Sequence, residues 1–292
     1  MSLSGAAMPG SEGAPETMTG AERRSVPGNE GLAHRAILGM RVDALTYPEA
    51  IERVVRWARA GEGRTVGVAT VNNVMEGYDH PPFRDVMNGC DLVTPDGTPL
   101  VWGLRLLGVS DATRVYGPEL TPRLLARAAE VGVPVGFYGG SPEVVEALRV
   151  VAADRWPALT IAYAYSPPFR TLDDREDDEI VRAIVDSGAR ILFVGLGCPK
   201  QERWMSEHRD RLPLVQLGVG AAFDFLAGTK RQAPAVLQRA GLEWLFRLVT
   251  EPRRLWKRYL RHNPRFVALF GAQVIRDRST GAGSGSQGRP RA

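Results

Sequence analysis

The feature that most restricts the fold of this chain is a repeated succession of short apolar runs, polar or glycine-rich breaks and amphipathic helical patterns. The runs are short and rich in apolar residues, which is typical of buried strands rather than helices. Five of them lead into such a break, at 65–69, 91–94, 133–138, 190–194 and 214–217. A further strand is predicted at 160–165.

Strands that alternate with helices are joined by right-handed crossovers, which produce a parallel sheet covered on both faces. We therefore expect an α/β fold with a Rossmann-like, mostly parallel sheet, helices on both faces and a basic helical C-terminal appendage. Ligands of such sheets bind outside the carboxyl ends of the strands. The pattern places these residues at that edge: Thr70, Asn72, Asp96, Gly139, Gly140, Ser141, Lys200, Gln201, Gly220 and Asp224.

Charge is distributed unevenly along the chain. Residues 1–228 hold 23 Lys and Arg against 30 Asp and Glu, a net charge of −7, whereas residues 229–292 hold 14 against 3, a net charge of +11. We predict four segments: a disordered leader at 1–33, an α/β domain that carries the chemistry at 34–228, a basic helical appendage at 229–278 and a disordered tail at 279–292. The two ends contain too few large apolar residues to offset the entropy of ordering, and the leader lacks the pattern of a signal peptide.

The basic segment also has an amphipathic pattern. Across 241–260, tryptophan, leucine and tyrosine residues alternate with arginine and lysine. A helix of this kind can lie in a bilayer interface and attract anionic lipid, or it can pack its apolar side on its own domain. Nucleic acid is disfavoured because no recognisable binding module accompanies the charge. Pro252 and Pro264 interrupt the pattern, so we expect two or three short helices.

Each motif at the strand ends has both a ligand-binding and a local structural interpretation. The stretch 139–142, Gly-Gly-Ser-Pro, can hold phosphate at a helix N-terminus or only cap that helix. Asp96 can serve as a general base or occupy a Pro-Asp-Gly turn. Thr70 and Asn72 can bind a ligand or cap the next helix, and Arg114 can pair with a diphosphate or remain solvated.

The glycine patterns disfavour NAD and ATP as ligands. Gly195 and Gly197 begin a dinucleotide-type pattern, but Lys200 occupies the position of its third glycine. Moreover, the strand at 160–165 is followed by Ser and Pro, where a dinucleotide site would have an acid for the ribose. There is no Walker A sequence. A uridine-type nucleotide sugar or another mononucleotide fits these breaks better.

The sequence does not indicate a metal centre. The acidic run at 173–179 is predicted to form the first turns of an exposed helix, where negative charge suits the helix dipole. Cys90 and Cys198 are too few for a disulfide framework or a structural zinc site and suit a reducing cytoplasm. The four histidines show no metal-ligand spacing: His34, His80, His208 and His262.

Taken together, the motifs resemble those of the WecG/TagA/CpsF glycosyltransferases. The resemblance runs from about residue 38 to about residue 270 and rests on the order of the motifs. They are Thr-x-Asn at 70–72, Thr-Pro-Asp-Gly at 94–97, Arg-Val-Tyr-Gly-Pro-Glu at 114–119, Phe-Tyr-Gly-Gly at 137–140, Gly-Leu-Gly-Cys-Pro-Lys-Gln-Glu at 195–202, Gly-Val-Gly-Ala-x-Phe-Asp at 218–224 and Gly-Leu-Glu-Trp-Leu-x-Arg-Leu at 241–248.

This resemblance implies an inverting transfer of a sugar, typically N-acetylmannosamine or a derivative, from a UDP-sugar to a polyprenyl-diphosphate-linked sugar. It implies that Asp96 is the general base and that Thr70, Asn72, Arg114 and Gln201 serve substrate binding or catalysis. Arg247 and Arg254 match arginines of an appendage that binds the membrane and closes over the site. We expect UDP-sugar contacts from Tyr138, Gly139, Gly140, Ser141, Gly195, Gly197, Lys200, Gly220 and Asp224.

The leading hypothesis is thus a cytoplasmic enzyme of cell-surface polysaccharide assembly, attached peripherally to the inner face of the cell membrane. No cofactor is expected beyond the UDP-sugar donor, and the sequence shows no evident metal site but leaves metal dependence open. The alternative is a membrane-recruited regulator that binds a nucleotide sugar without turnover, and an oxidoreductase is disfavoured by the missing ribose acid. The sequence leaves the oligomeric state open, a homo-oligomer included.

Overall fold

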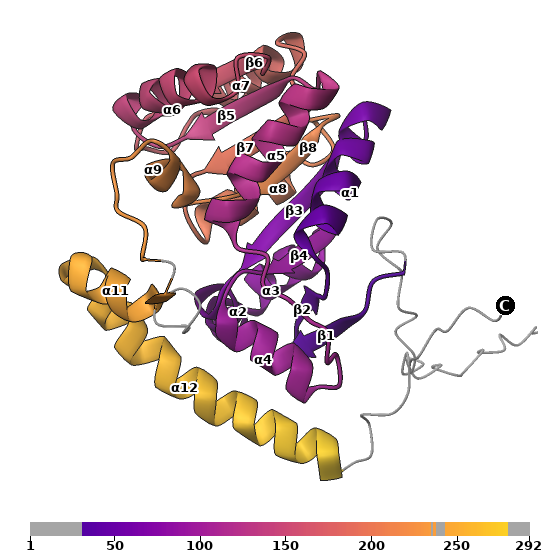
Figure 1. Cartoon of the computed structure of the whole chain (residues 1–292), viewed down its shortest axis with the longest axis vertical. Helices are drawn as coiled ribbons and strands as arrows, with labels where there is room; N and C mark the ends of the chain where they lie inside the picture. The colour runs from indigo at the N-terminus through magenta and orange to yellow at the C-terminus, as the bar shows by residue number, and fades with distance from the viewer. Residues whose placement is uncertain (1–30, 235, 238–242, 280–292) are drawn as a thin grey trace, which may run out of the picture.

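The computed structural model describes residues 31–234, 236–237 and 243–279 (Figure 1). The predicted leader at 1–33 and tail at 279–292 lie almost entirely outside these residues. The strands are β1 (His34–Ile37), β2 (Met40–Asp43), β3 (Arg64–Ala69), β4 (Leu92–Pro95), β5 (Val135–Gly139), β6 (Ile161–Tyr165), β7 (Ile191–Gly195) and β8 (Val215–Gly218). The helices are α1 (Tyr47–Ala60), α2 (Val71–Asp79), α3 (Pro81–Asn88), α4 (Thr98–Leu106), α5 (Gly117–Val131), α6 (Pro142–Arg155), α7 (Asp174–Asp186), α8 (Lys200–Glu207), α9 (Ala222–Leu226), α11 (Glu243–Thr250) and α12 (Pro252–Ser279).

Six strands form one parallel sheet in the order β4-β3-β8-β7-β5-β6. This confirms the predicted α/β fold, with each predicted strand displaced by at most two residues at either end. Since all six strands run in one direction, their carboxyl ends share one edge of the sheet. At that edge α2 starts at Val71, directly after β3, because the Thr70 side chain caps it by accepting from the Asn73 N–H.

Helices cover both faces of the sheet, as the alternating pattern predicts (Figure 1). On one face, α1, α5 and α6 pack on the strands around a cluster that contains Phe137, Phe193 and Phe223. On the other face, α7 and α8 pack over Leu192 and Val194. Near-continuous burial of the central strands follows from this double cover. The acidic run precedes and opens α7, where Asp173 caps the helix through Glu176, as expected from the sequence.

A small hairpin precedes the sheet and was not among the predicted strands. In it β1 pairs with β2 in antiparallel fashion through a two-residue turn at Leu38 and Gly39. Both turn residues have positive φ, 50° and 86°. Hairpin turns of this kind are normally signalled by Asn-Gly or Asp-Gly. A leucine in the left-handed region gives no such signal, which explains why the hairpin was missed.

In the described part of the basic segment, α11 has 8 residues and α12 has 28, where two or three short helices were predicted. Pro252 begins α12, but Pro264 lies inside it and does not end it, contrary to the prediction. An internal proline costs a helix about 3 kcal/mol. Packing offsets that cost, because Phe266, Phe270 and Val274 are buried against β1, β2 and α4. No described helix is long and apolar enough to cross a membrane.

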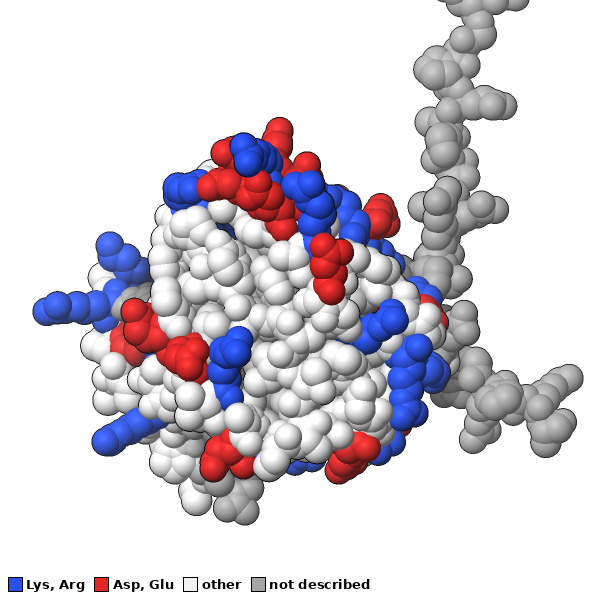
Figure 2. Space-filling model, turned by 90° about the horizontal axis from the view of Figure 1, so that it is seen from above, with Lys and Arg blue, Asp and Glu red and all other residues white. Residues whose placement is uncertain are grey.

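The end of the molecule opposite α12 has a different surface character. Figure 2 shows acidic and basic side chains mixed around a broad area without charged residues. The basic excess of the sequence is therefore not spread evenly over the molecule. It is concentrated in the chain that follows α9.

Candidate active site

The main cavity lies where the carboxyl ends of β3 and β4 meet α4, α11 and α12, and its volume is about 1020 Å³. It is far larger than a buried water site and falls in the range of cavities that hold small molecules. Five residues predicted from the sequence line it together: Thr70, Asn72, Asp96, Arg114 and Arg247. Residues from the body and from the C-terminal helices thus form one site.

Asp96 lies directly after β4, and its carboxylate is held from two sides. The Gly117 N–H donates to Oδ2 at 3.0 Å, and Arg114 Nη2 lies 3.8 Å from Oδ1. Burial raises the pKa of Asp96 to about 6, although Arg114 and the Gly117 N–H act in the opposite direction. A carboxylate with a pKa near 6 is ionised at neutral pH and basic enough to accept a proton.

Arg114 is fixed by a residue from the C-terminal segment. Its guanidinium donates to the Asp96 carbonyl and, at 2.7 Å, to Glu243 Oε2. Tyr116 Oη donates to Glu243 Oε1 at 2.5 Å, and the Arg114 guanidinium stacks over the Tyr116 ring at 4.0 Å. Glu243 is 8% exposed and begins α11. It therefore joins α11 to the loop that carries Arg114.

The amides at the start of α2 form a second buried cluster beside the cavity. Thr70 Oγ1 accepts from the Asn73 N–H at 3.4 Å, so the capping interpretation of Thr70 is correct. The same hydroxyl donates to Asn73 Oδ1 at 2.6 Å, and Thr70 also lines the cavity. Asn72 Nδ2 lies 3.4 Å from Cys198 Sγ. Asn73 Nδ2 donates to Glu202 Oε1 at 3.1 Å, which extends the cluster to α8.

Gln201 lies in this cluster rather than on the wall of the main cavity. Its Oε1 accepts from the Gly197 N–H at 3.1 Å and its Nε2 donates to Glu202 Oε1 at 2.9 Å. Glu202 is almost fully buried, and burial raises its pKa to about 6. Gln201 therefore supports the loop at the end of β7, which contains the cis Cys198–Pro199 peptide bond.

Three nitrogen atoms on the C-terminal helices are buried without a hydrogen-bond partner among the described residues: Arg247 Nε, Arg258 Nε and His262 Nδ1. All three residues line the main cavity. Buried polar groups in folded proteins nearly always have a partner. Arg247 and Arg258 also bring positive charge to the wall of the cavity, which suits an anionic ligand. The side chain of Arg254, also predicted from the sequence, lies outside the described residues.

The glycines at the ends of β5 and β7 do not line the main cavity. Gly139 and Gly140 have positive φ, and a Cβ on Gly139 would lie 2.6 Å from the carbonyl carbon of Gly195. A Cβ on Gly195 would overlap the Phe223 ring. Ser141 caps α6 by accepting from the Val144 N–H. These residues thus have packing roles of their own, and their predicted contacts with a nucleotide stay predictions.

The other predicted donor-binding residues are also separate from the cavity. The Tyr138 ring is 1% exposed and stacks on Trp204 at 4.5 Å, which places it in the core beneath α8. Lys200 is exposed, and Gly197 and Gly220 have positive φ. Asp224 forms an ion pair of 2.6 Å with Lys230. Ligand contacts from this group remain sequence-based expectations.

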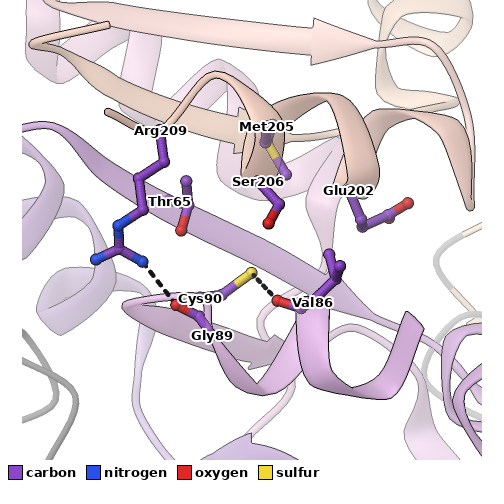
Figure 3. Close-up of a pocket in the computed structure, with 8 residues that line it drawn as sticks. All are labelled: Thr65, Val86, Gly89, Cys90, Glu202, Met205, Ser206 and Arg209. Atoms are coloured by element: carbon purple, nitrogen blue, oxygen red, sulfur yellow. Dashed lines mark hydrogen bonds between the residues drawn. The ribbon is translucent and has the colours of Figure 1, made fainter. Parts of the chain in front are cut away.

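A second cavity lies between α3 and α8, and its volume is only about 110 Å³ (Figure 3). Arg209 donates to the Gly89 carbonyl at 2.7 Å, and the Cys90 thiol donates to the Val86 carbonyl at 3.7 Å (Figure 3). The volume suits a few water molecules rather than a sugar. This cavity therefore belongs to the packing of α8 on α3.

Sequence reasoning missed the importance of Glu243, Tyr116, Arg258 and His262. Glu243 and Tyr116 lie inside the motifs at 241–248 and 114–119. The motifs therefore pointed to these segments, but not to the hydrogen bond between the two side chains. Arg258 and His262 have no motif of their own. Their role depends on how α12 folds back on the body, which no local pattern encodes.

Comparison with known proteins identifies the family of the chain. The model of the "Glycosyl transferase WecG/TagA/CpsF family" matches residues 35–280. A protein of Staphylococcus aureus (strain NCTC 8325 / PS 47), N-acetylglucosaminyldiphosphoundecaprenol N-acetyl-beta-D-mannosaminyltransferase, is 28% identical over 225 residues, which cover 76% of this chain and 85% of that protein. Proteins of the same name from strains COL and N315 match equally well. The resemblance found in the motifs is thereby confirmed, and the chain belongs to the WecG/TagA/CpsF family of glycosyltransferases.

Proposed function

We propose that this chain transfers a hexosamine, N-acetylmannosamine or a derivative, from a UDP-sugar to a polyprenyl-diphosphate-linked sugar. The printed name of the staphylococcal relatives supports this acceptor class. The observation that carries the proposal is Asp96, a buried carboxylate with a pKa of about 6 on the wall of a cavity large enough for a sugar.

The reaction is a single in-line displacement with inversion at the anomeric carbon. The acceptor hydroxyl attacks that carbon while its bond to the oxygen of UDP breaks. Asp96 accepts the proton of the hydroxyl as the new glycosidic bond forms. Because the Gly117 N–H and Arg114 hold the carboxylate, Asp96 is positioned before the substrate arrives.

The departing UDP gains negative charge, which needs stabilisation as it develops. Arg114 and Arg247 line the same cavity as Asp96 and carry fixed positive charge. Preorganised charge of this kind lowers the barrier without reorganisation during the reaction. We therefore expect transfer that needs no divalent metal and persists in a chelator.

The acceptor also bears on where the enzyme works. A polyprenyl chain keeps its diphosphate-linked sugar at a membrane surface, and the residues after 228 carry the basic excess of the sequence. Basic residues near an anionic leaflet each contribute about 1 kcal/mol. Peripheral attachment to the inner face of the cell membrane follows from the proposed function.

The test is a transfer assay that measures UDP release from UDP-N-acetylmannosamine and a polyprenyl-diphosphate N-acetylglucosamine analogue. Asp96→Asn should lower kcat by about 10²- to 10⁴-fold, the usual contribution of a general base. It should not lower the Tm, because burial makes the ionised carboxylate less favourable in the fold than in water.

Asp111→Asn is the matched control, since Asp111 is exposed and lies outside the cavity. It should retain wild-type activity. Equal UDP release by wild type and Asp96→Asn would disprove the assignment of the base. Binding of the UDP-sugar without transfer to any lipid-linked acceptor would instead indicate a regulator.

A further inference from the structure

The main cavity extends from the polar site into an open apolar groove. We name it the α4–α12 groove; its walls are Trp102, Gly103 and Leu106 of α4 and Val267, Phe270, Gly271, Val274 and Ile275 of α12. Several of these side chains face solvent, with exposed fractions of 56% for Trp102, 70% for Val267 and 72% for Ile275. Exposed apolar side chains gathered along one groove usually mark a binding surface.

The cavity changes character along its length. Asp96 immediately precedes α4, so the polar end lies at the start of that helix. Arg258 and His262 lie in the first half of α12, and Val267 to Ile275 lie in its second half. The two helices meet where Gly103 approaches the Phe270 ring. Along the cavity, the Asp96 carboxylate is therefore followed by the polar side chains of Arg258 and His262 and then by the apolar walls of the groove.

We propose that the α4–α12 groove binds the first isoprenoid units of the acceptor, while Arg258 and His262 contact its diphosphate. The inference rests on the proposed function, whose acceptor has the same order of parts: a sugar, a diphosphate and an apolar chain. From Val267 to Ile275 the helix rises by about 12 Å at 1.5 Å per residue. The groove is thus long enough for the first two or so isoprenoid units and the start of the next.

Charge complementarity favours this occupant over a plain bilayer surface. Arg258 Nε and His262 Nδ1 are buried without a partner among the described residues, and they lie on the same cavity as the apolar walls. A bilayer surface would meet the exposed cations of α12, whereas Arg258 and His262 are half-buried in the wall of the cavity. A single ligand with a diphosphate beside an apolar chain fits both features.

Gly271 provides the sharpest test of this groove. A Cβ at this position would meet no atom within 4 Å, and the backbone is helical. Gly271→Leu should therefore fill the groove without a clash, and leucine favours a helix more than glycine does. The matched control is Ala272→Leu, since Ala272 is exposed on the same helix and does not line the cavity.

The assay uses two soluble acceptors with the same sugar and diphosphate but two or four isoprenoid units, in buffer without vesicles. For wild type we expect kcat/KM to be at least about tenfold higher with the longer chain, since each buried methylene contributes roughly fourfold in affinity. Gly271→Leu should abolish most of that gain, so that the ratio of kcat/KM for the longer and the shorter acceptor falls towards one. Ala272→Leu should behave as wild type.

The possible outcomes separate the groove from the proposed function. No transfer with either acceptor would contradict the function itself. Transfer at rates independent of chain length would overturn the groove alone. If Gly271→Leu instead only increased sedimentation with anionic vesicles, the groove would be a membrane-contact face. If it only altered the elution volume in size exclusion, the groove would bind a second copy.

Leu106→Ser, on the opposite wall, should reduce the same chain-length ratio.

Discussion

The carboxyl ends of the strands form one edge of the sheet, and the two ends of that edge differ in how many of their polar side chains have hydrogen-bond or ion-pair partners. At the β5, β7 and β8 end, Ser141 caps a helix, Asp224 is paired with Lys230, and the glycines make room for neighbouring backbone and for Phe223. At the β3 and β4 end, Asp96 is buried with a raised pKa, and Arg247 has an unpartnered nitrogen within the described structure.

This difference shows how packing and binding can be told apart at one edge. The glycines at the β5, β7 and β8 end have packing roles that explain their presence without a ligand, and their nucleotide contacts stay predictions. Incomplete satisfaction around a cavity of about 1020 Å³ points to a ligand at the other end. Substitutions at the two ends should accordingly affect different measurements, stability at one and turnover at the other.

After Asp96→Asn, the largest effect expected from such substitutions is that of Glu243→Gln. It removes the charge that holds Arg114 and Tyr116 at 2.7 and 2.5 Å. A hydrogen bond to a charged group contributes about 1.5–3 kcal/mol, so kcat/KM should fall roughly 10- to 100-fold. Steady-state kinetics would measure this, with Glu207→Gln, an exposed position on α8, as the control. Unchanged kinetics would mean that α11 is not needed to position Arg114.

At the opposite end, Gly195→Ala should reduce stability. The new methyl group would overlap the Phe223 ring and force it to shift. Overpacking of this kind costs about 1–3 kcal/mol, which denaturant unfolding would detect. Gly271→Ala is the control, because neither Gly195 nor Gly271 has positive φ and a Cβ on Gly271 would meet nothing within 4 Å. An equal loss in both variants would show that the contact with Phe223 is not the cause.

A smaller effect concerns the pH dependence of transfer. Because ionised Asp96 is the active form and its pKa is about 6, kcat/KM should fall about tenfold per unit below that pH and level off above it. The Glu243 carboxylate raises the pKa of Asp96. In Glu243→Gln the midpoint should therefore move to lower pH, as a pH–rate profile would reveal. A midpoint that stayed in place would show that Glu243 acts only through Arg114.

The fold was largely predictable from the sequence because its strands are short, apolar and separated by distinct breaks. The hairpin of β1 and β2 was not, because its turn uses Leu38 where Asn or Asp is usual. The uninterrupted course of α12 was also not predictable. Burial of Phe266 and Phe270 on distant parts of the chain overrides the local effect of Pro264.

The candidate site was predictable to the extent that strand ends define it. Thr70, Asn72, Asp96 and Arg114 converge on one cavity, as position along the sheet edge and the family motifs indicated. Tyr138 does not join them, because alternate residues of a strand face opposite sides and its ring enters the core against Trp204. The buried pairing of Glu243 with Arg114 depends on a contact between residues 129 positions apart.

The last described helix also holds the first hairpin in place. The Gln273 side chain donates to the Ala36 carbonyl at 2.8 Å and accepts from the Leu38 N–H at 2.9 Å, which secures a turn in a conformation unusual for leucine. At about 5–20 residues per second, a ribosome needs roughly 10–50 s to make the chain between these partners. During synthesis the hairpin and the apolar faces of α2 and α4 therefore stay without their packing partner until α12 has been made. Nascent chains stalled before residue 266 should need chaperones most.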